Sequence, residues 1–156
     1  MTDTDGLYHE LRGELQALSS PLFEFAEQQV RKRGSFVPFG AGLTKDGEVS
    51  LHAASSGEDI VSSSAILPLL HEGLRSAVRE HALAAVGVCE WVNITREGSQ
   101  KSDAVKVLVE HERGLTVAFY VPCRRRLFRG WQFEAMFVRP ADPEVRPAWR
   151  RDVAQQ

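Results

Sequence analysis

Four consecutive segments of the chain alternate apolar and polar side chains, and only short connections separate them. They are residues 83–94, 103–111, 115–122 and 131–139. In the second segment Val105, Val107 and Val109 share one face, a pattern typical of a half-buried strand. Parallel strands need crossover connections of a dozen or more residues, whereas antiparallel strands need only short turns. The spacing therefore predicts an antiparallel meander.

A tight hairpin precedes the meander. We expect strands at residues 36–43 and 48–54, with Asp46-Gly47 between them. Asp-Gly is a favoured pair for such turns because glycine tolerates a positive φ. The hairpin and the meander together predict a sheet of about six strands.

Apolar periodicity also predicts helices. Four leucines at helical spacing indicate a helix over residues 3–18, namely Leu7, Leu11, Leu15 and Leu18. Ser20 and Pro21 suit the start of a second helix, or a kinked continuation, that ends at Arg33 before Gly34. A further helix is expected from about residue 63 or 64 to His81.

These elements give the order α(α)-β-β-α-β-β-β-β. The simplest packing is an α+β two-layer sandwich, in which two or three helices cover one face of an antiparallel sheet. The order is similar to that of roadblock- or profilin-like folds. We expect a single domain at residues 1–140, followed by a proline-rich, charged tail at residues 141–156 that is ordered at most in part.

The charge balance excludes some partner classes. Nineteen basic and twenty-one acidic residues give a net charge of −2, which argues against general nucleic-acid binding and against a polybasic membrane surface. No segment approaches the ~18 apolar residues of a membrane span, and the first residues are too acidic for a signal peptide. Two cysteines suit a reducing compartment. We therefore expect a cytoplasmic protein.

The segment FVPFGAGL at residues 36–43, followed by DGEV at 46–49, resembles the first hairpin of cytidine deaminases. That family needs a glutamate two residues after its first zinc ligand, and a Pro-Cys-x-x-Cys motif for the other ligands. Here Ala54 stands two residues after His52, and Arg126 stands three residues after Cys123. Both requirements fail, so we exclude deaminase activity.

The same segment, with Phe25-Ala26-Glu27 and Gly34 ahead of it, also resembles a recurring core of small bacterial proteins. This resemblance covers most of the chain. It implies no particular activity, because those proteins have none assigned.

Other catalytic patterns are incomplete, and we expect no metal and no cofactor. His71-Glu72 begins like the zinc motif H-E-x-x-H, but Arg75 stands at the second ligand position. Cys123 ends a strand beside three arginines, so it is a candidate reactive thiol, with an inert strand-end cysteine as the alternative. Glu90 lies on an apolar stripe, either as an acid–base group with a raised pKa or as a member of a cross-strand ion pair on a wet face.

The strongest charged feature lies between the last two expected strands. Its candidate binding residues are Arg124, Arg125, Arg126, Phe128, Arg129 and Trp131. Arginines interleaved with aromatic rings can bind carboxylates, phosphates or an acidic protein surface. Alternation along the last strand places Trp131, Phe133 and Phe137 on one face, which would form an aromatic patch.

The favoured hypothesis is a non-enzymatic protein-interaction module, acting through a protein partner or as a homodimer. It would use the aromatic sheet face and the arginine-rich connection. The alternative is a small anionic-ligand-binding protein or enzyme, with a pocket between residues 55–64 and the arginines that contains Glu90, His52 or Cys123. Nucleic-acid binding ranks third.

Overall fold

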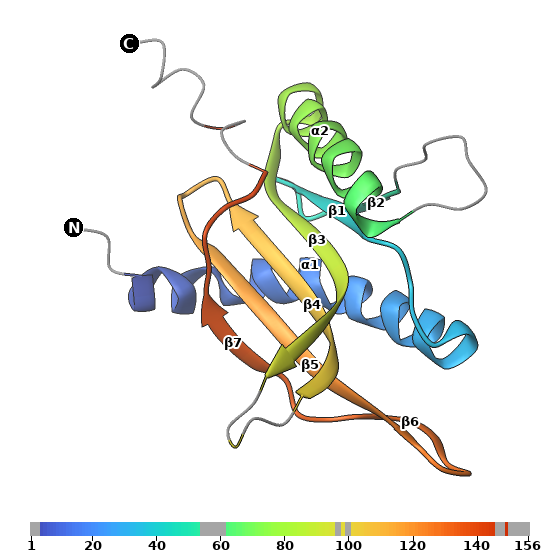
Figure 1. Cartoon of the computed structure of the whole chain (residues 1–156). Helices are drawn as coiled ribbons and strands as arrows, with labels where there is room; N and C mark the ends of the chain where they lie inside the picture. The colour runs from blue at the N-terminus through green and yellow to red at the C-terminus, as the bar shows by residue number, and fades with distance from the viewer. Residues whose placement is uncertain (1–3, 54–61, 96–97, 99–100, 146–148, 150–156) are drawn as a thin grey trace.

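The computed structural model describes residues 4–53, 62–95, 98, 101–145 and 149, and in them the chain forms one antiparallel sheet with two helices (Figure 1). The elements are α1 (Thr4–Arg33), β1 (Phe39–Thr44), β2 (Val49–His52), α2 (Ser63–His81), β3 (Leu83–Thr95), β4 (Lys101–His111), β5 (Thr116–Arg126), β6 (Gly130–Phe133) and β7 (Phe137–Pro140). The strands are ordered β2-β1-β3-β4-β5-β6, and β7 also pairs with β5. The expected α+β class with an antiparallel sheet is confirmed.

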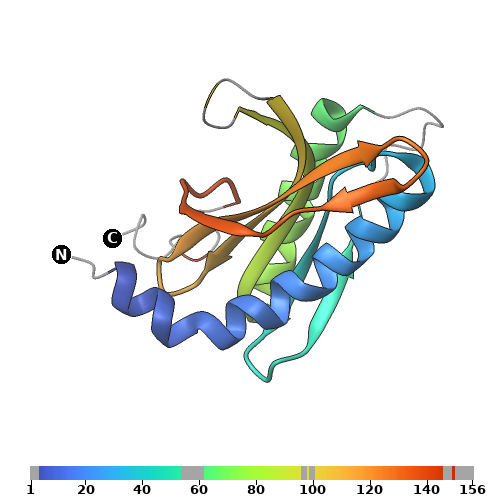
Figure 2. The same ribbon diagram turned by 90° about the horizontal axis from the view of Figure 1, so that it is seen from below.

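The two helices lie on opposite faces of the sheet, whereas the sequence led us to expect them on one face. Alternation along β3 shows this, because successive side chains of a strand point to opposite faces. Ala85 and Cys89 pack in the core beneath α1, while Val86 and Val88 pack with α2. Figure 2 shows α1 running along one side of the strands. Residues 83–89 are all buried because both faces of β3 are covered there.

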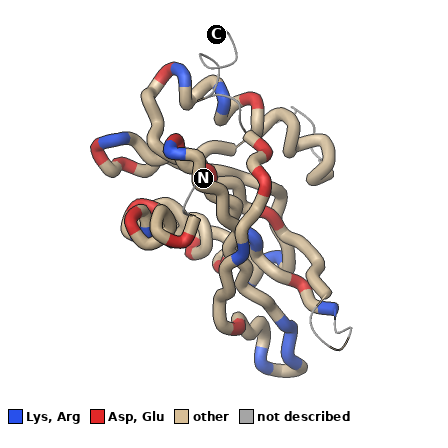
Figure 3. Tube along the Cα trace, turned by 90° about the vertical axis from the view of Figure 1, so that its left-hand side faces the viewer, with Lys and Arg blue, Asp and Glu red and all other residues tan. Residues whose placement is uncertain are grey.

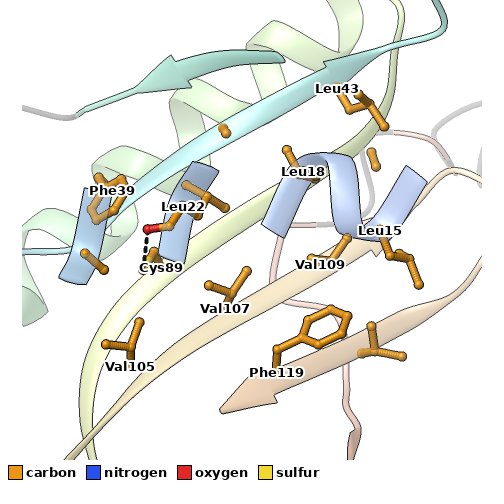
Figure 4. Close-up of a cluster of buried hydrophobic side chains, with 14 of the residues drawn as sticks. Leu15, Leu18, Leu22, Phe39, Leu43, Cys89, Val105, Val107, Val109 and Phe119 are labelled. Atoms are coloured by element: carbon orange, nitrogen blue, oxygen red, sulfur yellow. Dashed lines mark hydrogen bonds between the residues drawn. The ribbon is translucent and has the colours of Figure 1, made fainter. Parts of the chain in front are cut away.

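α1 is one helix of 30 residues with Pro21 inside it, so the expected helix at 3–18 and its continuation form a single element. Proline removes one helical hydrogen bond and bends a helix, and α1 is bent in Figure 2. Its buried stripe follows helical spacing and packs on the sheet: Leu11, Leu15, Leu18, Leu22, Ala26 and Val30. Figure 4 shows three of these leucines above Val105, Val107, Val109 and Phe119.

Glycines allow the layers to approach one another. A Cβ built on Gly87 would lie 2.8 Å from Leu22 Cδ1, on the side of α1. A Cβ on Gly40 would lie 2.7 Å from the carbonyl oxygen of Gly87 and 3.2 Å from Leu74 Cδ1, on the side of α2. A Cβ does not fit at 2.7 Å from a backbone oxygen, so Gly40 lets β1 and β3 pack closely. On the helix sides, a Cβ at either position would push a leucine side chain away from the sheet.

The segment expected as one strand at 131–139 is two strands with a register shift between them. Cys123 of β5 faces Phe133 of β6, and Tyr120 of β5 faces Phe137 of β7. Three positions separate Tyr120 from Cys123 on β5, but four separate Phe133 from Phe137 on the other side. One extra residue reverses the faces of everything that follows it.

The aromatic side chains therefore do not share one face, contrary to the expectation from alternation. Trp131 and Phe133 pack beside the core beneath α1. Phe137 stacks on Tyr120 on the opposite face, with the ring centroids 5.1 Å apart. Phe119, the remaining aromatic residue of β5, is buried in the core.

Part of the segment that follows β7 packs on the α2 side of the sheet. Val145 is fully buried beside Leu70 and Val88, and Trp149 Nε1 donates a hydrogen bond to the Leu83 carbonyl oxygen. The buried Glu110 carboxylate accepts hydrogen bonds from the backbone N–H groups of Glu144 and Val145. Residues 146–148 and 150–156 of the expected tail lie outside the described residues.

We predict that Gly40→Ala lowers the free energy of unfolding by roughly 1–3 kcal/mol, because the new methyl group collides with the backbone of β3. Gly13→Ala is the matched control, since a Cβ at Gly13 meets nothing within 4 Å. In the middle of α1 this control should raise the free energy of unfolding by about 0.5–1 kcal/mol. Urea unfolding followed by circular dichroism measures both. Equal effects of the two substitutions would contradict the close approach at Gly40.

Candidate functional site

The hairpin that joins β5 to β6 carries most of the candidate binding residues and projects beyond the body of the protein (Figure 1). The Arg129 N–H donates to the Arg126 carbonyl oxygen across the turn. At the tip, Phe128 has a φ of 64° and is 98% exposed, and Leu127 is also exposed. The chain thus presents two apolar side chains to solvent, one of them on a backbone conformation that L-residues avoid.

Arg31, near the end of α1, joins this hairpin from a distant part of the sequence. Its Nη1 donates to the Trp131 carbonyl oxygen at 3.5 Å, and its guanidinium carbon lies 4.8 Å from the centre of the Phe133 ring. A 2.9 Å ion pair with Glu27, one helical turn earlier, holds the guanidinium in place. The helix and the hairpin therefore form one surface.

A depression of about 590 Å³ opens between them, which we call the arginine hollow. It is lined by Glu27, Arg31, Arg126, Arg129, Trp131, Gln132 and Phe133. Three guanidinium groups face one carboxylate there, so the lining has an excess of positive charge. Arg126 Nε donates to Gln132 Oε1 at 2.6 Å, which fixes the direction of the guanidinium.

The structure brings together three of the six candidate binding residues: Arg126, Arg129 and Trp131. Arg124 turns to Glu134, with Nε 3.3 Å from Oε1. Arg125 is exposed opposite Trp131 in the strand register, and Phe128 stands at the tip, so neither lines the hollow. Sequence reasoning missed Arg31, whose only signal was its place in the basic end of the first helix.

A second depression, of about 640 Å³, lies beside the first, and we call it the aromatic hollow. Its lining is Phe25, Gln29, Arg33, Ser35, Phe36, Val37, Pro38, Phe39, Ala53, Ser62, Ser63 and Trp91. Trp91 connects the two hollows, because its ring packs edge to face on that of Trp131, with the ring centroids 5.7 Å apart. Nothing in the alternation pattern indicated this cluster, since its rings come from α1, β1, β3 and the connection at residues 34–38.

The three residues named for the small-ligand alternative lie apart from the two hollows. Glu90, His52 and Cys123 line neither hollow. His52 lies on β2, at the opposite edge of the sheet from β6. Of the loop expected at 55–64, Ser62 and Ser63 line the aromatic hollow, and residues 54–61 lie outside the described part of the chain.

The surroundings of Cys123 favour the inert strand-end cysteine over the reactive thiol. Its side chain is buried in the core beneath α1 and its Sγ lies 3.2 Å from the Val121 carbonyl oxygen. Burial raises the pKa of the Cys123 thiol to about 12. Adjacent residues of a strand point to opposite faces, so the sequence neighbour Arg124 does not share the environment of this thiol.

Glu90 forms the expected cross-strand ion pair, but not on a wet face, because the side chains of Glu90 and Lys106 are only 15% and 19% exposed. It faces Lys106 of β4 in the register, and its Oε2 lies 3.9 Å from Lys106 Nζ. Lys106 also approaches Glu144, which in turn lies 3.5 Å from His71 Nε2. Burial raises the pKa of Glu90 and Lys106 opposes this shift. The cluster belongs to the α2 side of the sheet, away from both hollows.

Among the described residues, no group of three or more His, Cys, Asp and Glu side chains is placed to hold a metal ion. Within the same residues, neither helix is both long and apolar enough to cross a membrane. No family model, curated protein or solved structure matches the chain.

We predict that neither Cys89 nor Cys123 reacts with a disulfide reagent such as dithionitrobenzoate while the protein is folded. Both side chains are buried, and burial raises the pKa of each thiol, so the reactive thiolate is scarce. Two thiols should appear after addition of guanidinium chloride. Rapid modification of one thiol in the native protein would contradict the burial of Cys123 or Cys89.

We predict that Glu90→Gln changes the pH dependence of stability. Because the pKa of Glu90 is raised in the fold, the native state binds this proton more tightly than the unfolded state. This contribution to stability is therefore present at low pH and is lost as the pH rises through the folded pKa. Urea unfolding between about pH 4 and pH 7 should show the variant gaining stability relative to the wild type as pH increases. A difference independent of pH would contradict the raised pKa.

Proposed function

We propose that this chain is a non-enzymatic protein-interaction module that binds an acidic segment of a partner protein. The binding surface is the basic end, which we define as Arg31, Lys32 and Arg33 of α1 with Arg124, Arg125, Arg126 and Arg129 of the hairpin. The observation that carries the proposal is the convergence of these two basic segments on one hollow. In Figure 3, Lys and Arg gather at the end where the hairpin projects.

The basic end contrasts with the charge of the whole chain. The net charge is −2, yet seven cations gather here, and Glu27 and Glu134 are the carboxylates paired with Arg31 and Arg124. Such an asymmetric distribution attracts anionic groups to one end and repels them elsewhere. Guanidinium groups bind carboxylates through two parallel hydrogen bonds, which gives direction as well as attraction.

The shape of the site favours a macromolecular partner over a small ligand. Pockets for small molecules enclose most of the ligand surface, but the arginine hollow is a broad open depression at the base of an exposed hairpin. The apolar tip at Leu127 and Phe128 adds contact area that a small anion would not use. The acidic balance of the chain disfavours a long polyanion such as nucleic acid.

The same charges argue for a different protein rather than a second copy of this chain. A two-fold contact places the same surface patch of both copies together. Two basic ends would then face each other and repel. A partner with exposed Asp and Glu residues satisfies the arginines instead.

We predict that a fluorescein-labelled decapeptide of alternating Asp and Glu binds the protein. The double substitution Arg126→Glu and Arg129→Glu should weaken this binding at least about tenfold, because two charge-assisted contacts are lost. Fluorescence anisotropy measures the dissociation constants at low salt. The control, Lys45→Glu with Arg79→Glu, changes the net charge equally at exposed sites outside the basic end and should leave affinity within about twofold.

Three competitors decide between partner classes. Excess unlabelled peptide should displace the labelled peptide. Inorganic phosphate, citrate, and an oligothymidylate with the same net charge as the peptide should not displace it. Displacement by phosphate or citrate at lower concentration than the peptide would replace the proposal with the small-anion alternative. Displacement by oligothymidylate would replace it with nucleic-acid binding. Equal loss in the control variant would show that net charge alone drives the association.

A further inference from the structure

We infer that the acidic segment carries an apolar anchor, a Leu or Phe side chain that enters the aromatic hollow while its carboxylates contact the arginine hollow. The inference rests on the proposed function and adds the chemistry that would distinguish the partner from any other acidic chain. It is carried by the adjacency of the two hollows and by the apolar side chains that the second one leaves exposed.

The two hollows share a wall. Trp131 lines the arginine hollow and Trp91 lines the aromatic hollow. Their rings pack edge to face, with the ring centroids 5.7 Å apart. The chain passes Trp131 at Gly34, which has a φ of 80° and where a Cβ would make an ordinary van der Waals contact with Trp131 Cζ2. An extended segment advances about 3.3 Å per residue, so a short stretch of one partner chain can place side chains in both hollows.

The aromatic hollow keeps apolar surface in contact with water. Phe25 is 39% exposed and Val37 is 49% exposed, and both line the hollow together with the buried ring of Phe39 and the partly buried rings of Phe36 and Trp91. Burial of such surface by a partner contributes binding energy that charge pairs at an exposed site do not provide. Binding energy in protein interfaces concentrates in desolvated apolar and aromatic contacts of this kind.

The positive charge of Arg31 and Arg33 beside the two hollows determines which partner residues are favoured next to the anchor. Arg33 lines the aromatic hollow, and Arg31 lines the arginine hollow two residues before it in α1. Both exposed guanidinium groups stand where residues beside an inserted anchor would pass. An acidic residue next to the anchor is therefore favoured, and a basic one is repelled.

The arrangement of the rings suits an inserted aliphatic or aromatic side chain better than stacked bases. The ring plane of Trp91 is inclined by 57° to that of Phe36 and by 81° to that of Trp131. Single-stranded nucleic acid is held by flat platforms on which successive bases stack. Rings that stand across one another do not form such a platform.

The test compares two labelled decapeptides. One contains only Asp and Glu, and the other replaces its two central residues with Leu-Phe. Anisotropy titration of the wild-type protein should give about tenfold tighter binding of the Leu-Phe peptide, because its anchor leaves water. Val37→Ser should remove most of this gain and leave the affinity for the all-acidic peptide unchanged.

The control for this variant is Val138→Ser on β7, which trims a 37%-exposed valine outside both hollows. It should bind both peptides as the wild type does. Circular dichroism and the melting temperature of each variant establish that it is folded. If Val138→Ser weakens the preference for the Leu-Phe peptide as much as Val37→Ser does, the anchor does not bind in the aromatic hollow and the assignment is overturned.

Failure of the inference is distinguishable from failure of the proposed function. If the wild type binds both peptides equally, the anchor is wrong and the basic end remains the binding surface. If it binds neither peptide, the proposed function fails and the inference falls with it. If the Leu-Phe peptide binds more tightly but Val37→Ser keeps the gain, the anchor lies elsewhere and the inference is overturned.

Discussion

The double burial of β3 is the constraint on which the rest of the structure depends. One face of this strand lies beneath α1 and the other beneath α2, and Gly87 removes the side chain that would hold α1 away. Interiors are packed as densely as organic crystals, so the position of one layer determines that of the next. The direction of α1 across the sheet is therefore fixed by the core and not by its polar surface.

That direction positions the candidate site. α1 spans about 45 Å at 1.5 Å per residue, and its last turn carries Arg31 to the Trp131 carbonyl oxygen, 100 residues away in sequence. The hairpin between β5 and β6 supplies the other guanidinium groups, from Arg126 and Arg129. Neither segment forms a hollow alone. The charge of the site thus depends on apolar packing along the whole of the helix.

The sequence analysis predicted the elements whose signals are local and missed those that depend on distant contacts. Asp46-Gly47 and the alternating valines identified the hairpin and the central strands, because turn chemistry and the two-residue period act over a few positions. The placement of α1 and α2 on opposite faces was missed, because the apolar stripe of a helix can pack on either face of a sheet that is buried on both sides. The extra residue between Phe133 and Phe137 left no compositional trace, and the arginine cluster was recognised without Arg31 because only the fold brings them together.

The register shift between β6 and β7 also has a consequence for the free protein at high concentration. An unpaired outer strand is a template on which further chains can add and grow into fibrils. Here that edge is divided into two four-residue strands offset by one residue, and β7 carries the exposed Arg139. No long, regular row of backbone groups is offered to a neighbouring molecule along this border. The irregularity thus shortens the regular edge that strand addition requires, next to the exposed apolar tip of the hairpin.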